Sequence, residues 1–292
     1  MKVGLFPMVT NPFATGDYLE ALARGAEERG FHSLWAPEHV VLFDEYRSRY
    51  PYAADGRIPA GGETGIFEPF LVLTRFAAVT RRIRLGTGIC LVPQRNPVYT
   101  AKQVATLDFI SGGRFDFGVG VGWLREEFEA VGVPFERRGA RCREYLGVMR
   151  TLWCDPVSSF EGEFYRLPPC RHYPKPVQQP HPPIHFGGES RAALERVADL
   201  GQGWYTFNRS PEELAAALPE LDRLLAERGR SRSEVMITVC PYLRPLEDDA
   251  VERYREAGAD QVLLVMVAPD LASLEKTLDQ LAETHVARAA RL

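Results

Sequence analysis

Short apolar runs, rich in residues that favour β-structure, alternate with helical patterns eight times along this chain of 292 residues. The runs predicted as strands are residues 3–6, 33–36, 83–88, 115–119, 183–186, 203–207, 235–239 and 261–265. After each of them, apolar residues recur at helical spacing, so a helix is expected to follow every strand. Eight strand–helix repeats predict a (β/α)8 TIM barrel, and the chain length suits that fold with modest insertions.

A doubly wound open sheet is the alternative fold. It does not need an eighth repeat, and it usually carries a glycine-rich phosphate loop directly after its first strand. Here Phe6-Pro7-Met8 follows the first strand, and none of the three is glycine. The barrel is therefore the preferred prediction.

Two long insertions interrupt the repeat. Residues 38–67 are rich in Tyr, Arg, Gly and Pro, and residues 155–182 contain a segment, 160–164, that predicts a hairpin. Neither insertion has the character of a separate domain, so residues 1–292 are predicted to form a single domain.

Local signals mark several helix ends. Ser190, Ser210 and Asp270 stand where N-cap residues are expected, each just before a helical pattern. Pro219 lies inside the helix that follows Ser210, and we expect it to kink that helix.

Composition excludes several classes of function. Lys and Arg number 35 against 39 Asp and Glu, a net charge of −4 that argues against nucleic-acid binding. No apolar run is long enough to span a membrane, and the N-terminus resembles a first strand more than a signal peptide. The five cysteines form no C-x-x-C pair, which predicts reduced thiols and a cytoplasmic location. Metal-binding and nucleophile motifs are absent, so a bound cofactor is expected to carry the chemistry.

In a TIM barrel the active site lies at the C-terminal ends of the strands. The second strand ends at Glu38 and His39, and His39 is the best candidate for a polar active-site group, with an ordinary surface histidine as the alternative. The fifth strand ends at Gly187-Gly188-Glu189-Ser190, which leads into a helix. That turn fits a phosphate site, and it fits equally a serine that only caps the helix.

Several motifs in combination resemble the luciferase-like monooxygenase superfamily. They lie at residues 85–97, 101–108, 111–115, 118–128, 132–135, 138–141, 174–176 and 182–188. Within that superfamily, Pro37-Glu38-His39 followed by residues 44–46 and 49–52 resembles a branch of probable F420-dependent oxidoreductases.

The resemblance implies that the barrel mouth binds the deazaflavin F420 or a flavin. Glu38 and His39 would contact the ring, a non-proline cis peptide at Gly88-Ile89 would support it, and the turn from Gly187 to Ser190 would hold its phosphate. The residues assigned to the cofactor in this way are Glu38, His39, Thr87, Gly88, Ile89, Gly120, Val121, Gly122, Trp123, Gly187, Gly188, Glu189 and Ser190.

Two departures limit what the resemblance implies. Trp123 stands where a sugar-phosphate dehydrogenase branch has a glutamate that moves a proton, so that role is vacant here. Val121 stands near the position of an arginine that helps to hold the flavin phosphate in bacterial luciferase, which disfavours that mode of FMN binding. Glu126 and Glu127 fit the branch pattern, and compensation of the helix dipole explains them without chemistry.

The resulting hypothesis is an F420-dependent oxidoreductase that transfers a hydride between the deazaflavin and a small organic substrate, with His39 as the catalytic acid or base. Residues 40–67 would form a partial lid, and Tyr46, Tyr50, Tyr52 and Trp204 would form the substrate walls. The alternative is an FMNH2-dependent two-component monooxygenase that uses O2 and a separate cofactor reductase. A non-catalytic cofactor carrier is a further alternative. No metal, nucleic-acid or membrane partner is expected, and a homodimer is.

Overall fold

Eight parallel strands close into a barrel in the computed structural model, which describes residues 1–292. Neighbouring strands pair in the order β3-β2-β1-β11-β10-β9-β8-β5, and pairing of β3 with β5 closes the ring. The strands are β1 (Lys2–Pro7), β2 (Ser33–Ala36), β3 (Arg84–Thr87), β5 (Phe115–Gly120), β8 (Ile184–Gly187), β9 (Gly203–Phe207), β10 (Met236–Cys240) and β11 (Gln261–Met266). The predicted TIM barrel is confirmed, and all eight predicted strands are present within two residues at each end.

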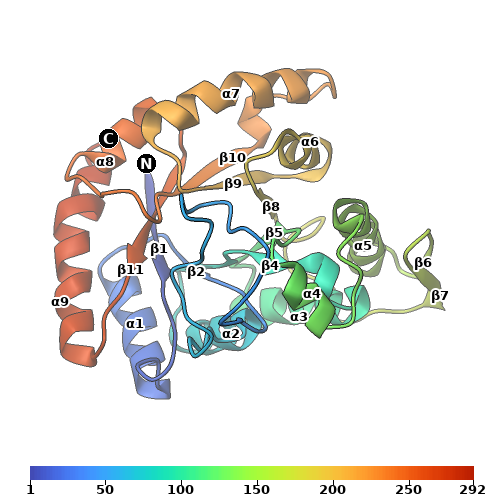
Figure 1. Cartoon of the computed structure of the whole chain (residues 1–292), viewed down its shortest axis with the longest axis horizontal. Helices are drawn as coiled ribbons and strands as arrows, with labels where there is room; N and C mark the ends of the chain where they lie inside the picture. Colours follow the sequence, from blue (N-terminus) through green and yellow to red (C-terminus); the bar gives the residue numbers. More distant parts are fainter.

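Helices surround this barrel, as the ring of coiled ribbons outside the arrows in Figure 1 shows. They are α1 (Gly16–Glu28), α2 (Pro69–Val79), α3 (Pro97–Ser111), α4 (Arg125–Ala130), α5 (Arg138–Cys154), α6 (Arg191–Leu200), α7 (Pro211–Ala226), α8 (Ala250–Glu256), α9 (Leu271–Leu281) and α10 (Ala287–Ala289). Short 3-10 turns lie at η1 (Val92–Gln94) and η2 (Arg232–Glu234), and a π-turn lies at η3 (Ala282–Val286). None of the helices combines the length and the apolar character needed to cross a membrane.

The predicted caps are confirmed. The Ser190 side chain accepts from the N–H of Ala193 at the start of α6, and Ser210 and Asp270 form capping boxes at the starts of α7 and α9. These contacts satisfy backbone donors that a helix start leaves free. Pro219 lies inside α7, which nevertheless continues to Ala226, so the proline does not end this helix.

Apolar side chains pack in two layers. The larger one fills the space between the barrel and the helices, and the smaller one fills the barrel interior with Phe6, Trp35, Tyr205, Cys240 and Leu263. Because successive side chains of a strand point to opposite faces, Tyr205 points into the barrel and its neighbour Trp204 points out towards the helices.

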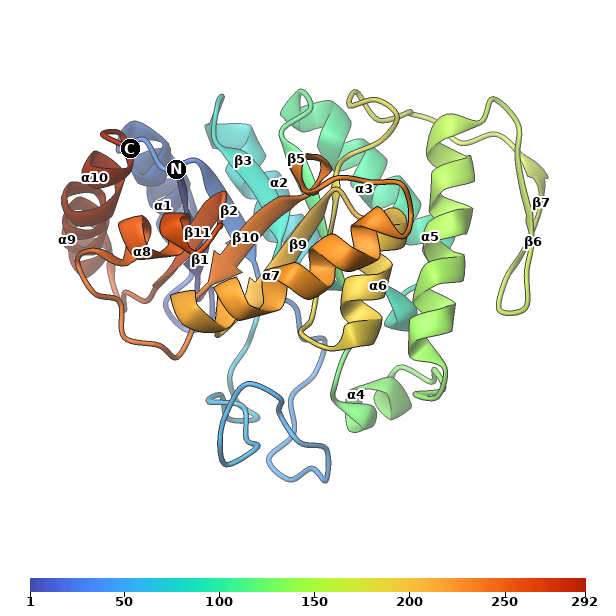
Figure 2. The same cartoon turned by 90° about the horizontal axis from the view of Figure 1, so that it is seen from above.

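The two insertions lie away from the barrel wall. Residues 40–67, here called the lid, form an irregular excursion that extends with α4 beyond the C-terminal ends of the strands (Figure 2). The second insertion contains the predicted hairpin, formed by β6 (Ser158–Glu161) and β7 (Arg166–Cys170), which stands at the far side of α5 (Figure 2). A short strand, β4 (Cys90–Leu91), pairs with the end of β5 and extends the barrel wall beside the mouth.

Candidate active site

The predicted site segments meet at one end of the barrel. They follow the C-terminal ends of β2, β3, β5 and β8, the end from which the lid projects in Figure 2. The Ile89 side chain joins three of these segments, because a Cβ atom added to Gly120 or Gly187 would overlap its Cδ1 atom. The glycines at these two strand ends therefore leave room for Ile89, which forms part of the floor of the mouth.

The predicted cis peptide is present between Gly88 and Ile89. Thr87, just before it, is fully buried, and its hydroxyl donates to the carbonyl oxygen of Gly118 at 2.6 Å. Thr87 therefore links β3 to β5 below the mouth. Its hydroxyl proton is used in this hydrogen bond between the two strands.

His39 is held by Glu127, a residue that fits the branch pattern and that compensation of the helix dipole was expected to explain. Its Nδ1 atom lies 3.2 Å from Oε1 of Glu127 on α4. Glu127 is fully buried and also accepts from the N–H of Val40 at 2.7 Å and from Nε2 of Gln94 at 2.9 Å. Burial opposes ionisation of Glu127, but the hydrogen bonds from His39, Gln94 and Val40 outweigh it and lower its pKa.

The ionised carboxylate fixes one tautomer of the histidine. An anionic Glu127 oxygen accepts the Nδ1 proton of His39, so Nε2 is left free to accept or donate a proton. The imidazole side chain remains partly exposed, while the carboxylate is closed off from solvent. This pairing gives His39 a defined orientation beside Trp123, whose ring centre lies 6.0 Å from that of His39.

Glu38 serves a different partner from the one expected. Its carboxylate forms an ion pair with Arg95 and accepts from the N–H of Leu91 in β4 at 2.6 Å. Arg95 also pairs with Glu68 at the start of α2. Both oxygens of Glu38 have a partner and its side chain is buried, so Glu38 anchors the chain that follows the cis peptide. Its contact with the cofactor ring stays a prediction.

Aromatic side chains cover the mouth. The Trp123 ring packs edge-to-face against Tyr46 and Tyr50 of the lid, Tyr50 packs against Tyr52, and Tyr52 packs against Phe207 at the end of β9. Tyr50 is only 7% exposed, and burial together with its hydroxyl contact to Tyr242 raises its pKa. The three lid tyrosines therefore form a continuous row of ring contacts from Trp123 to Phe207, and their role as substrate walls stays a prediction.

The prediction for Trp204 was wrong. Its ring is fully buried between the barrel and the helices, and its indole N–H donates to the carbonyl oxygen of Gly188 at 3.0 Å. On β9 it is Phe207 that packs with the aromatic side chains of the mouth, against Phe6, Tyr52 and Tyr242. Sequence reasoning missed Phe207 because both faces of a barrel strand are apolar, and alternation then gives no direction.

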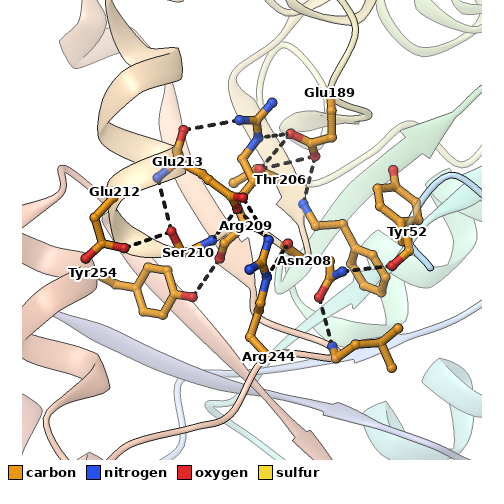
Figure 3. A network of polar contacts seen from close by, with 12 residues as sticks. Tyr52, Glu189, Thr206, Asn208, Arg209, Ser210, Glu212, Glu213, Arg244 and Tyr254 are labelled. Atoms are coloured by element: carbon orange, nitrogen blue, oxygen red, sulfur yellow. Dashed lines mark hydrogen bonds and ion pairs between the residues drawn. The ribbon is translucent and has the colours of Figure 1, made fainter. Parts of the chain in front are cut away.

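Polar contacts hold the lid at two places. On one side, Glu126 of α4 accepts from the N–H of Arg47 and from the Ser48 hydroxyl, both at 2.7 Å. On the other side, the Asn208 side chain donates to the carbonyl oxygen of Tyr52 at 2.9 Å and accepts from the N–H of Leu243 (Figure 3). Asn208 has a left-handed backbone, with φ 57°, and it joins the lid to the loops after β9 and β10.

The turn after β8 has its own polar network. Gly188 has φ 110°, a conformation that favours glycine, and Ser190 caps α6 as described. The Glu189 carboxylate accepts from the Thr206 hydroxyl and the N–H of Phe207, and it pairs with Arg209 (Figure 3). Glu189 therefore ties this turn to the end of β9, and its negative charge is already neutralised.

Val121, Gly122 and Trp123 follow β5 and complete the rim. Gly122 has φ 78°, and a Cβ atom there would lie 2.8 Å from the Phe128 ring. The indole nitrogen of Trp123 and the hydroxyl of Tyr205 are buried without a hydrogen-bond partner. Two unpaired buried donors at the mouth fit a ring system that carries acceptor nitrogens and oxygens, as flavins and deazaflavins do.

The family model for luciferase-like monooxygenases matches residues 1–291. The chain belongs to the luciferase-like monooxygenase family. The uncharacterized protein Rv0953c of Mycobacterium tuberculosis is 34% identical over 247 residues, which are 84% of this chain and 86% of that relative. The FMNH2-dependent dimethylsulfone monooxygenase of Pseudomonas putida is 30% identical over 237 residues, 80% of this chain and 60% of that enzyme.

A solved F420-dependent secondary alcohol dehydrogenase, in complex with an F420–acetone adduct, has the same fold. It superposes with a TM-score of 0.76 at 20% identity and covers 98% of each chain. The chain is therefore similar in sequence to an FMNH2-dependent enzyme and similar in fold to an F420-dependent one.

Proposed function

We propose that this luciferase-like protein is an F420-dependent oxidoreductase acting on a small organic substrate. The observation that carries the proposal is the Glu127-held imidazole of His39 at the mouth of the barrel. When bound, F420 supplies hydride transfer at C5 of its ring. The protein must then supply or remove one proton on the substrate, and His39 Nε2 is the group available for that step.

The remaining residues hold this arrangement. Ile89 and the glycines at the ends of β5 and β8 form the floor on which the ring would lie. Trp123 Nε1 and Tyr205 Oη are the donors that would hold it. Tyr46, Tyr50 and Tyr52 exclude water once the lid is closed, and the lid must shift to admit the ring because Tyr50 is packed against Trp123.

The first test is cofactor binding. Purified protein is titrated separately with F420 and with FMN, and fluorescence quenching gives each dissociation constant. We expect micromolar or tighter binding of F420. Binding of FMN without any response to F420 would overturn the preferred cofactor.

The second test is turnover. Reduced F420 is mixed anaerobically with a panel of ketones, aldehydes and enones, and its reoxidation is followed by absorbance. The expected result is reoxidation that His39→Ala slows by roughly 100-fold or more. If F420 binds and no member of a broad panel is turned over by the wild-type protein, the protein is a carrier.

The second candidate is an FMNH2-dependent monooxygenase. It is favoured by the 30% identity to the dimethylsulfone monooxygenase. It requires O2 and a separate reductase that supplies FMNH2. Substrate-dependent oxygen uptake with chemically reduced FMN distinguishes it from the F420 enzyme, which consumes no oxygen.

We also propose that two copies of the chain form a homodimer through α2 and α3. These neighbouring helices expose the large apolar side chains of Leu71, Tyr99, Phe109 and Ile110. An exposed apolar face of this kind is typical of a subunit interface. Light scattering on a sizing column should give a dimer for the wild type and a monomer for Phe109→Asp; a monomeric wild type contradicts the proposal.

A further inference from the structure

Four neighbouring strands of the barrel carry none of the residues that the family resemblance assigns to the cofactor. These strands, β9, β10, β11 and β1, pair in that order and form one half of the wall. The residues assigned to the cofactor lie at the ends of β2, β3, β5 and β8, which form the other half. The mouth is thus divided, and the half at β9, β10, β11 and β1 is the place for a substrate.

Apolar side chains line this half of the mouth. Met8 follows β1, Phe207 ends β9, Tyr242 follows β10 and Val265 belongs to β11, and all four are partly buried against the interior cluster. The ring centre of Phe207 lies 4.5 Å from that of Tyr242 and 5.7 Å from that of Phe6. These side chains form a lining without a charged residue, here called the apolar half.

The loops next to the apolar half also expose large apolar side chains. Phe13 lies in the loop after β1, Leu243 in the loop after β10, and Val267 in the loop after β11. Leu271, at the start of α9, is exposed as well. Single exposed apolar residues are ordinary, but four beside three neighbouring strand ends are typical of the approach to an apolar binding site.

The charged residues that follow these strands already have partners. Arg209 is the first after β9 and pairs with Glu189, and Arg244 is the first after β10 and pairs with Glu213 (Figure 3). Asp270, the first after β11, caps α9. No charged residue lies between β1 and α1. A charged group bound in the apolar half would therefore find no free counter-charge on these loops.

The lid adds no charge to the apolar half. Tyr50 is buried, and Tyr52 is half-buried with its ring packed against Phe207. All the charged side chains of the lid are exposed, namely Asp44, Glu45, Arg47, Arg49, Asp55, Arg57 and Glu63. The lid therefore presents aromatic rings to the mouth and its charged groups to solvent.

From this arrangement we infer that the substrate is an uncharged molecule whose non-reacting part is apolar, an alkyl or an aryl group. The inference rests on the proposed function, since the reacting group must lie within reach of His39 Nε2. An alkyl or aryl group gains by burial against Met8, Phe207 and Val265. A carboxylate or an ammonium group there would lose its hydration and gain no ion pair, which strongly disfavours its binding.

The test compares substrates that differ only in charge. Benzylacetone is measured against its analogue with a carboxylate on the ring, and against the methyl ester of that acid. Methyl pentyl ketone and the keto acid of the same chain length form a second set. The oxidation of reduced F420 gives kcat/KM for each compound. The shift in melting temperature that each compound causes without cofactor is a second measurement, independent of turnover.

In the wild type, kcat/KM should be about tenfold or more higher for each neutral ketone than for its acid, and the methyl ester should recover most of the loss. A smaller ratio overturns the inference and leaves the proposed function standing. If no compound is turned over but the neutral compounds raise the melting temperature and the acids do not, the apolar half stands and the proposed function fails. Neutral compounds that neither react nor stabilise the protein overturn the inference.

A charge placed in the apolar half should change this preference. Met8→Lys should lower the preference for benzylacetone over its acid by roughly tenfold, because the ammonium group pairs with the carboxylate. Met8→Gln, which is polar but uncharged, should keep the acid excluded. Val157→Lys is the matched control, since Val157 is exposed beside the hairpin on the far side of α5, and it should behave as the wild type. An unchanged preference in a folded Met8→Lys variant contradicts the place given to the substrate.

Discussion

His39 Nδ1 lies 3.2 Å from Oε1 of Glu127, a residue 88 positions later in the chain. Replacement of Glu127 by Gln keeps the shape of the side chain but replaces the anionic carboxylate with a neutral amide. The amide can donate as well as accept, so His39 is no longer restricted to the tautomer with its proton on Nδ1 and a free Nε2. We expect kcat to fall by roughly 10- to 100-fold, with little change in cofactor affinity.

The division of the effect between kcat and KM separates this positioning role from simple damage. Loss of the carboxylate removes the acceptor that fixes the His39 tautomer, so kcat should fall while KM stays close to the wild-type value. Glu129→Gln, an exposed substitution on the same helix, is the control and should leave kcat unchanged. An unchanged kcat in Glu127→Gln would contradict the assigned role.

Acid should loosen the lid through Glu126. Burial opposes ionisation, but hydrogen bonds from the Ser48 hydroxyl and from the N–H of Arg47 lower the pKa of this carboxyl to about 2. Because the pKa of Glu126 in the folded protein is below the usual value of 4.5, its stabilisation of the closed lid is complete above pH 4.5. This stabilisation should be lost progressively as the pH falls from 4.5 towards 2.

Hydrogen exchange of the backbone around residues 47–48 measures this effect. We expect protection to decrease over that pH range in the wild type and to be low at every pH in Glu126→Gln. Protection that stays constant between pH 5 and pH 2 in the wild type would show that Glu126 does not hold the lid. Peptides from α7 serve as the internal control, since they do not touch Glu126.

Removal of the charge of Glu38 should destabilise the protein. Glu38→Gln leaves Arg95 half-paired in a buried position and weakens the contact to Leu91 in β4. Breaking a buried ion pair from one side costs on the order of 3 kcal/mol in the free energy of unfolding. Urea unfolding measures it, and Glu68→Gln, which removes the more exposed partner of Arg95, should cost less.

Trp204 and Phe207 should respond differently to substitution. Trp204→Phe removes the hydrogen bond to Gly188, and we expect a loss of about 1–2 kcal/mol in stability with KM for the substrate unchanged. Phe207→Leu alters the wall of the mouth and should change KM while stability falls less. If Trp204→Phe changed KM and Phe207→Leu did not, Trp204 would be the residue that lines the substrate site.

Local signals in the sequence predicted most of the fold. Ser190, Ser210 and Asp270 were recognisable as caps because a cap needs only the next three residues. The barrel strands were recognisable because they are short apolar runs at regular intervals. Pro219 lies inside α7 without ending it, and the kink expected at this proline stays a prediction.

The candidate site was predictable only in outline. Because active sites of TIM barrels lie at the C-terminal ends of the strands, His39 and the glycine-rich turns could be predicted as site residues. Their hydrogen-bond and ion-pair partners could not, because these lie in segments far away in the sequence. Glu38 binds Arg95, which lies 57 positions away, and His39 binds Glu127. A shift of one residue along β9 would move Trp204 from the helix-facing side of the strand to the barrel interior. The sequence of β9 does not distinguish the two sides, because residues on both are apolar.

Two adjacent side chains of one short helix, Glu126 and Glu127, hold the lid and the imidazole respectively. Any movement that carries α4 away with an opening lid also withdraws the group that aims the histidine. If His39 is the proton donor or acceptor of the proposed reaction, opening of the lid removes the carboxylate that orients it. Proton transfer is then possible only while the lid encloses the substrate.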